Sequence, residues 1–166
     1  GTSLRALTKA VKEIGFDVAA TDISKFIIER ARKLQKDIDF QVEDIEKTSG
    51  KQDEFHLIFV IKTIERLKDP KKALKNIKAR LKKDGLLVFA SPYPTGKTPS
   101  DPTLISVKSP EEWIRIGKEL GFKKMKFNYV SFLPYLYKYH SFFSRAFPIK
   151  IELPIIVNTC FVIFEN

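Results

Sequence analysis

Short apolar segments alternate with helix-type patterns along the first ninety residues, and this alternation limits the fold more than any other feature. Apolar residues at helical spacing run from residue 3 to 14, a strand pattern covers 17–21, and a second helix pattern covers 25–36. Gly15 and Ser24 stand where a helix end and a helix N-cap are expected. Such alternation predicts a parallel sheet with helices packed on it.

The pattern continues with strands that are richer in apolar residues. Residues 38–42 form a short strand pattern, and Phe55–Ile61 is nearly all apolar, as expected for a strand that is covered on both faces. Pro70 stands at the start of a helix pattern that reaches Leu81. Asp84-Gly85 is typical of a turn, and a buried strand is predicted over 86–90.

The remaining residues predict a different arrangement. Residues 92–102 are rich in Pro, Gly, Ser and Thr and predict a loop, and a helix follows over 109–120. Strand patterns over 124–132 and 153–164 suggest an antiparallel pair, whereas the aromatic stretch 133–147 is ambiguous. No domain boundary is visible. We therefore expect one domain over 1–166, with a cofactor-binding half at 1–92 and a substrate-side part at 93–166.

Composition excludes several classes of protein. The 166 residues include 43% hydrophobic and 30% charged residues, which is typical of a folded domain and not of a disordered chain. No apolar run is long enough to predict a transmembrane segment, and no signal peptide is visible. Cys160 is the only cysteine, so an internal disulfide and a thiolate zinc cluster are excluded. These features favour a cytoplasmic protein.

The net charge of +10 has more than one interpretation. Most lysines lie on helix faces together with acidic residues, which favours a lysine-rich surface like that of proteins from heat-loving organisms. Nucleic acid, an anionic membrane or an acidic substrate are alternative partners for such a charge. A nucleic-acid partner is the less favoured alternative.

An acidic residue closes one of the predicted strands. Asp22 follows the apolar segment 18–21, and the helix pattern begins directly after it. A carboxylate at the carboxyl end of a parallel strand can accept hydrogen bonds from both hydroxyls of a ribose, and open α/β sheets bind nucleotides along this edge. The alternative is that Asp22 only caps the helix that follows.

Four stretches of the chain resemble class I S-adenosylmethionine-dependent methyltransferases of the methyltransferase type 11 group. They are 15–24, 40–45, 64–74 and 81–89, and the resemblance extends over about residues 1–125. It implies a Rossmann-like three-layer α/β sandwich with a mostly parallel sheet and an antiparallel C-terminal strand pair. It also implies S-adenosylmethionine as the cofactor and methyl transfer as the activity.

The resemblance also implies a set of cofactor-binding residues: Gly1, Asp22, Ile23, Asp44, Ile45, Ile61 and Lys62. Asp22 would hold the ribose hydroxyls, and Ile23 would cover one face of the adenine. Asp44 would accept from the adenine amino group, with the Ile45 backbone near the ring, although Asp44 could also be an ordinary loop acid. Ile61 and Lys62 would pass close to the methionine part.

The acceptor side is less defined by the sequence. Glu65, Tyr93 and His140 are the candidates for catalysis there, although a passive surface histidine is the favoured interpretation of His140. Residues 121–151 hold ten Phe or Tyr and six Lys or Arg but no acidic residue. A strand and a helix that pack on the core are the favoured interpretation, and a wall around an apolar substrate, nucleic-acid binding and membrane contact are the alternatives. Among acceptors, the aromatic residues favour a small molecule of lipid-like or aromatic character. No spacing of His, Cys or acidic residues suggests a metal site.

Several departures from the family pattern matter for function. The first strand and its glycine-rich turn are missing from this sequence, so we expect residues upstream of Gly1, a strand from a partner such as a second copy in a homodimer, or a re-paired sheet. His56, Arg66 and Lys83-Asp84 replace the usual Asp, His and Pro-Gly. The rival functions are a catalytically inactive methyltransferase-like scaffold and an RNA-binding or RNA-modifying protein.

Overall fold

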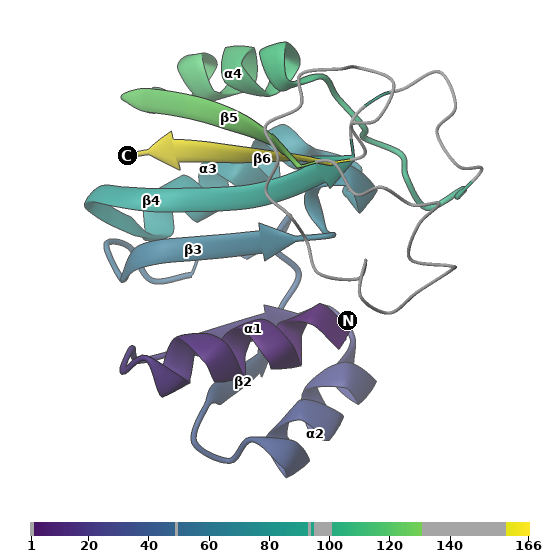
Figure 1. The fold of residues 1–166 in the computed structure, drawn as a ribbon, viewed down its shortest axis with the longest axis vertical. Coiled ribbons are helices and arrows are strands. Elements are labelled where there is room, and N and C mark those ends of the chain that lie inside the picture. Colours follow the sequence, from purple (N-terminus) through teal and green to yellow (C-terminus); the bar gives the residue numbers. More distant parts are fainter. Residues whose placement is uncertain (1, 49, 93, 95–100, 131–158) are drawn as a thin grey trace. The chain divides into compact units, whose positions relative to one another are not determined.

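The computed structural model describes residues 2–48, 50–92, 94, 101–130 and 159–166. Their contacts group them into two compact units, Gly1–Thr48 and Ser49–Asn166, and each unit is described by itself. Each unit contains its own sheet with helices packed on it (Figure 1). Of the predicted site residues, Gly1, Tyr93 and His140 lie outside the described residues.

The first unit is a β-α-β arrangement preceded by a helix. Its elements are α1 (Thr2–Glu13), β1 (Ala19–Asp22), α2 (Lys25–Leu34) and β2 (Asp39–Val42). β1 and β2 pair in parallel, with Ala19 opposite Asp39 and Asp22 opposite Val42. The predicted helices and strands are confirmed, although β1 lies about one residue later than expected and α2 ends two residues earlier.

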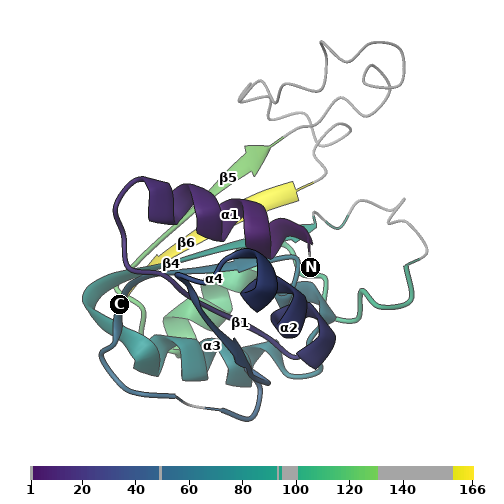
Figure 2. The same cartoon turned by 90° about the horizontal axis from the view of Figure 1, so that it is seen from below.

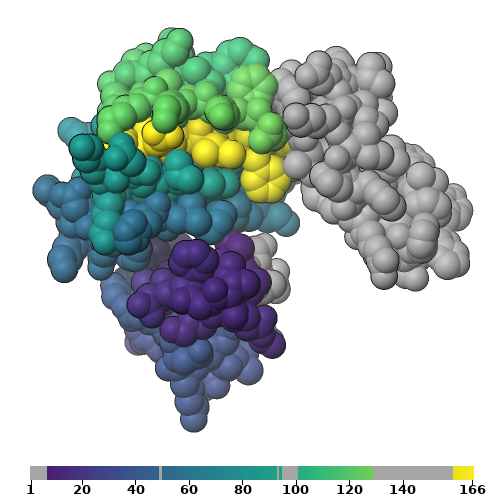
Figure 3. Space-filling view, turned by 60° about the vertical axis from the view of Figure 1, so that its left-hand side comes forward, coloured from purple at the N-terminus to yellow at the C-terminus, as the bar shows by residue number. Residues whose placement is uncertain are grey.

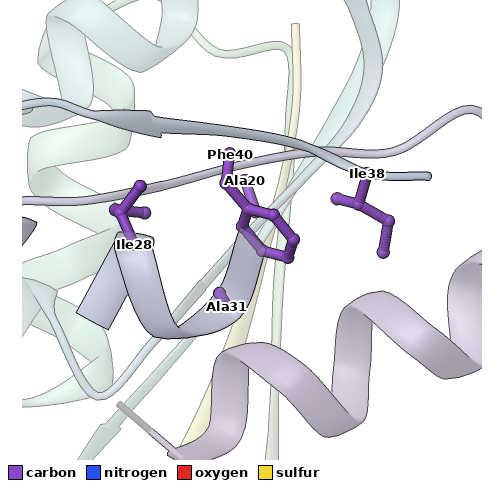
Figure 4. Close-up of a cluster of buried hydrophobic side chains, with 5 residues drawn as sticks. All are labelled: Ala20, Ile28, Ala31, Ile38 and Phe40. Atoms are coloured by element: carbon purple, nitrogen blue, oxygen red, sulfur yellow. The ribbon is translucent and has the colours of Figure 1, made fainter. Parts of the chain in front are cut away.

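A small apolar core holds this unit together. Ala20 of β1 lies opposite Phe40 of β2, and both are buried. Ile28 and Ala31, three residues apart on α2, share one face of that helix and are buried with them. Figure 4 shows these side chains, with Ile38, gathered between α2 and the two strands.

The second unit is a four-stranded mixed sheet with two helices. Its elements are β3 (Phe55–Ile61), the 3₁₀ helix η1 (Ile64–Arg66), α3 (Pro70–Arg80), β4 (Leu81–Pro92), α4 (Pro110–Glu119), β5 (Lys124–Val130) and β6 (Thr159–Glu165). The strand order is β3-β4-β6-β5, in which β3 and β4 are parallel and β6 is antiparallel to both neighbours. Figure 3 shows the yellow atoms of β6 between the green atoms of β5 and the teal atoms of β4. The antiparallel C-terminal pair is confirmed.

The start of β4 differs from the prediction. The turn expected at Asp84-Gly85 lies inside a strand that already begins at Leu81, so the predicted strand 86–90 was too short. Leu81 pairs with Phe55 and Leu86 with Leu57, so extra residues of β4 bulge out between these pairs. Asp84 has φ +61°, and a Cβ on Gly85 would come within 2.8 Å of a backbone oxygen. Asp84 and Gly85 therefore adopt the backbone conformation of a β-bulge in β4 and do not form a turn between two elements.

The two faces of this sheet differ. α3 and α4 lie on one side of it (Figure 2), and the strand residues that point to that side are buried. Trp113 of α4 is fully buried, and its ring meets Phe89 edge-on at 5.3 Å between centroids, as expected for a packing residue. On the other side of the sheet, Leu57, Phe59 and Leu86 are 37–40% exposed.

The predicted α/β fold is confirmed, with one addition. Among the described residues, β1 pairs only with β2 and β3 only with β4, so the parallel strands belong to two sheets. In the same residues, no helix is long and apolar enough to cross a membrane.

Candidate functional site

Two carboxylates lie at the same edge of the β1–β2 sheet. Asp22 is the last residue of β1 and pairs with Val42, the last residue of β2, and Asp44 follows two residues later. The Glu43 amide donates to the Asp22 carbonyl at 3.0 Å, which extends the pairing beyond β2. Adjacent strands are about 4.8 Å apart. The structure therefore brings Asp22 and Asp44 together at the carboxyl end of neighbouring parallel strands.

Asp22 also orders the turn into α2. Its Oδ1 accepts a hydrogen bond from the Ser24 amide at 2.9 Å. Ser24 is the N-cap of α2, and its hydroxyl accepts from the Ile27 amide at 3.4 Å. The helix is thus capped by Ser24, while Asp22 fixes the backbone of the capping residue. This contact fixes the orientation of the carboxylate.

Asp44 is held in a similar way. Its Oδ1 accepts from the Glu46 amide at 3.1 Å, and its Oδ2 lies 3.1 Å from the Lys47 ammonium. Its carbonyl accepts from the amides of Lys47 and Thr48, both at 2.9 Å. These contacts form a turn that begins at Asp44 and includes the half-buried Ile45. Asp44 is therefore an anchored residue at the strand end.

Large apolar side chains are exposed beside Asp22. Ile23 is 70% exposed and Phe26, in the first turn of α2, is 69% exposed. Side chains of this size gain free energy when an apolar partner covers them. Phe26 was not among the predicted site residues, and its only signal in the sequence is an apolar residue in a helix turn next to the strand-ending acid.

In the second unit, the chain takes an unusual conformation where β3 ends. Ile61 is the last residue of β3 and is half-buried, and Lys62 follows with φ +54°. The Thr63 hydroxyl donates to the Ile61 carbonyl at 3.2 Å. A lysine in the left-handed region is uncommon, and such residues concentrate at functional sites. Sequence reasoning placed Ile61 and Lys62 in the site but had no signal for this backbone.

Glu65 is a buried carboxyl in η1. It is 2% exposed, and its Oε2 has no hydrogen-bond partner among the described residues. Burial raises the pKa of this carboxyl, because the charged form loses its hydration. Arg66 and Lys62 act in the opposite direction and Asp101 in the same direction, each with a smaller effect on the pKa. A carboxyl of this kind suits proton transfer better than an ordinary surface acid.

A comparison with models of protein families identifies one family. The sequence model of a family described as "Methyltransferase domain" matches residues 1–89, which is more than half of the chain. No curated protein sequence matches the chain significantly.

Solved structures resemble the whole described fold. The chain is similar to an S-adenosylmethionine-dependent methyltransferase from Archaeoglobus fulgidus, with a TM-score of 0.72 at 15% identity over 96% of this chain and 80% of that one. It is similar to a methyltransferase of Haloferax volcanii in complex with the Trm112 activator, with a TM-score of 0.75 at 18% identity over 99% and 78%. The chain is also similar to an S-adenosylmethionine-dependent methyltransferase from Mesorhizobium loti, with a TM-score of 0.73 at 13% identity over 96% of this chain and 85% of that one. These identities establish the fold alone.

Proposed function

The chain belongs to the methyltransferase domain family, and on this premise we propose that it transfers a methyl group from S-adenosylmethionine to a small-molecule acceptor. S-adenosylmethionine is the methyl donor that the family and the fold indicate. The observation that carries the proposal is the placement of Asp22 and Asp44 at one edge of the β1–β2 sheet. Ligands of open α/β sheets bind outside the carboxyl ends of the strands.

The residues at this edge fit the nucleoside part of the cofactor. Asp22 would accept hydrogen bonds from the ribose hydroxyls, and Asp44 from the adenine amino group. Ile23, which is 70% exposed, would cover an adenine face, with the Ile45 backbone near the ring. Because turns anchor both carboxylates before any ligand binds, little conformational entropy would be lost on binding.

The reaction asks for alignment more than for acid–base chemistry. When bound, S-adenosylmethionine supplies a methyl group that its sulfonium already activates. The chain would bind the methionine part beside Ile61 and Lys62 and orient the acceptor for an in-line displacement. Glu65 would take the proton that an O–H or N–H acceptor loses, since a raised pKa brings a carboxyl closer to the working pH. We place Tyr93 and His140 on the acceptor side on sequence grounds.

The aromatic composition of the C-terminal third supports an acceptor of lipid-like or aromatic character. Ten Phe or Tyr within residues 121–151 could line an apolar wall. An RNA acceptor is the second candidate, supported by the net charge of +10. The dependence of acceptor binding on salt concentration distinguishes the two candidates. Binding of RNA should weaken steeply as the salt concentration rises, whereas binding of an uncharged aromatic acceptor should not.

The proposal is tested by calorimetric titration of S-adenosylmethionine into the protein, followed by methyl-transfer assays with acceptor panels. We expect saturable binding that S-adenosylhomocysteine competes for, because both ligands share the nucleoside. A titration without heat at millimolar cofactor, confirmed by an equilibrium-dialysis measurement, would refute cofactor binding. Binding without transfer to any small-molecule or RNA acceptor would instead favour the scaffold alternative.

A further inference from the structure

Residues 101–109, which we call the strap, run along η1 and hold it by polar contacts. The Ser106 amide donates to the Glu65 carbonyl at 2.9 Å, and the Ser106 hydroxyl donates to the Leu67 carbonyl at 2.7 Å. The Asp101 carboxylate pairs with the Arg66 guanidinium at 3.1 Å. Three successive residues from Glu65 onward are therefore each bound by the strap.

The strap is ordered at both of its ends by its own hydrogen bonds. Asp101 Oδ1 accepts from the Thr103 amide at 2.9 Å and from the Thr103 hydroxyl at 2.6 Å. At the other end, Ser109 and Glu112 form a capping box that begins α4. The strap can therefore move as a short ordered segment between Asp101 and Ser109, and its contacts with η1 can break without loss of its internal structure.

Glu65 cannot exchange a proton with an acceptor in the state that the structure shows. The side chain is only 2% exposed, so solvent hardly reaches the carboxyl in this state. β4 and α3 also pack on η1, but they are core elements, with Leu74, Ile77 and Leu87 at 0–1% exposed. The strap is held to η1 by the polar contacts of Ser106 and by the half-exposed pair of Arg66 with Asp101. It is the neighbour of Glu65 that can open most easily.

We propose that the strap is a closing element of the acceptor side, and that Ser106 and Asp101 are positioning residues that hold it shut over Glu65. This inference rests on the proposed function, because it gives Glu65 its role on the acceptor side. In the closed state the strap excludes water from Glu65. An acceptor enters when the strap opens, and reclosing would bury the acceptor's reacting group beside the carboxyl.

The electrostatic setting of Glu65 makes the closed state measurable. Lys62 beyond β3, Arg66 in η1 and Asp101 in the strap are the described charged groups that act on its pKa. β4 and α3 contribute no described charge to it. Opening of the strap would rehydrate the carboxyl and remove Asp101 from its surroundings, and both changes lower the pKa toward the ordinary value.

The test is the titration of Glu65 by carboxyl ¹³C NMR in glutamate-labelled protein, with Glu65→Gln to assign the resonance. Amide exchange at residue 106 is measured in parallel. Ser106→Ala should lower the Glu65 titration midpoint toward the ordinary glutamate value and speed amide exchange at residue 106 about fivefold or more, as expected for loss of one hydrogen bond. Ser106→Thr, which keeps the hydroxyl, should restore both values. Ser109→Ala is the matched control, because Ser109 lies in the strap but caps α4 and should leave the Glu65 midpoint unchanged.

The outcomes separate the strap from the cofactor site. An unchanged Glu65 midpoint and an unchanged exchange rate in Ser106→Ala would overturn the proposal. If Ser106→Ala does not fold, Asp101→Asn replaces it in the test. This variant keeps an acceptor for Thr103 but breaks the ion pair with Arg66. Amide exchange at residue 106 as slow as in wild type would then overturn the proposal. None of these measurements needs a cofactor. A failure of S-adenosylmethionine binding would therefore refute the proposed function without changing the result for the strap.

Discussion

Replacement of Asp22 separates a ligand-binding role from a structural one. Asp22→Ala removes both carboxylate oxygens, including the one that accepts from the Ser24 amide at 2.9 Å. Asp22→Asn keeps an acceptor for that amide but loses the charge. The alanine variant should therefore weaken both cofactor binding and the turn into α2, whereas the asparagine variant should weaken binding and leave the turn in place.

The magnitudes follow from the number of bonds. Hydrogen bonds from hydroxyls to a charged acceptor contribute about 1.5–3 kcal/mol, so Asp22→Ala should raise the dissociation constant of S-adenosylmethionine by about 10- to 150-fold. Loss of the bond to the Ser24 amide should lower the free energy of unfolding by about 0.5–1.5 kcal/mol. Asp22→Asn should give a smaller loss of affinity, because its amide can still donate to one ribose oxygen.

The assay is calorimetric titration combined with urea unfolding, and the same sheet provides the control. Asp39 begins β2 and therefore lies at the amino end of the strands, opposite to Asp22. Asp39→Ala removes an equal charge without touching the proposed site. Equal affinities for wild type and Asp22→Ala, or equal losses in Asp22→Ala and Asp39→Ala, would refute the assignment of Asp22 to the ribose.

Three further predictions concern the second unit. Glu65→Gln should become more stable than wild type as pH rises above about 4.5, because the buried wild-type carboxyl has a raised pKa and ionises at a cost in the folded state. Urea unfolding at pH 4 and pH 8 measures the difference in the free energy of unfolding. A difference that does not grow with pH would contradict the prediction. Cys160 is buried and its pKa is raised to about 11, so a thiol reagent at pH 8 should modify it only after unfolding; rapid modification of the native protein would show that the strand is open. Gly117→Ala should destabilise the protein by about 1–3 kcal/mol in urea unfolding, because the new Cβ would lie 2.7 Å from Met125 Sδ and 2.8 Å from Phe164 Cζ. This loss should exceed the gain in helix propensity of about 1 kcal/mol. An unchanged or higher stability would mean that the two side chains move aside.

Local signals in the sequence were sufficient for most of the elements. The helix starts could be recognised from capping residues in the sequence. Ser24 and Ser109 cap α2 and α4, and Pro70 begins α3 after the N-cap Asp69. β3 has the predicted bounds because an apolar run with polar residues on both sides leaves few alternatives. The same reasoning placed Asp22 at a strand end, and its position beside Asp44 followed once β1 and β2 were expected to be parallel.

Other features depend on contacts between distant residues, which no local pattern contains. The segment Leu81–Gly85 has the composition of a turn, but pairing of Leu81 with Phe55 draws it into β4. The left-handed backbone conformation of Lys62 could not be predicted, because no glycine stands at that position. The strap could not be predicted either, because the partners of Ser106 lie about forty residues away in the chain, at Glu65 and Leu67. The contacts of the proposed acceptor side are therefore largely nonlocal, unlike those of the nucleoside edge.

The chemistry gives a reason for assigning different carboxylates to cofactor binding and to proton transfer. Positive charge on the sulfonium disperses as the methyl group leaves, so an ionised carboxylate beside it would stabilise the bound cofactor more than the transition state. Asp22 and Asp44, assigned to ribose and adenine, act where no charge changes during the reaction. Glu65, whose pKa is raised by burial, is instead assigned to the proton that the acceptor loses. Asp22 variants should then raise KM for the cofactor with little change in kcat, whereas Glu65→Gln should lower kcat with little change in cofactor affinity. If both replacements changed the same parameter, the division of roles between Asp22 and Glu65 would be wrong.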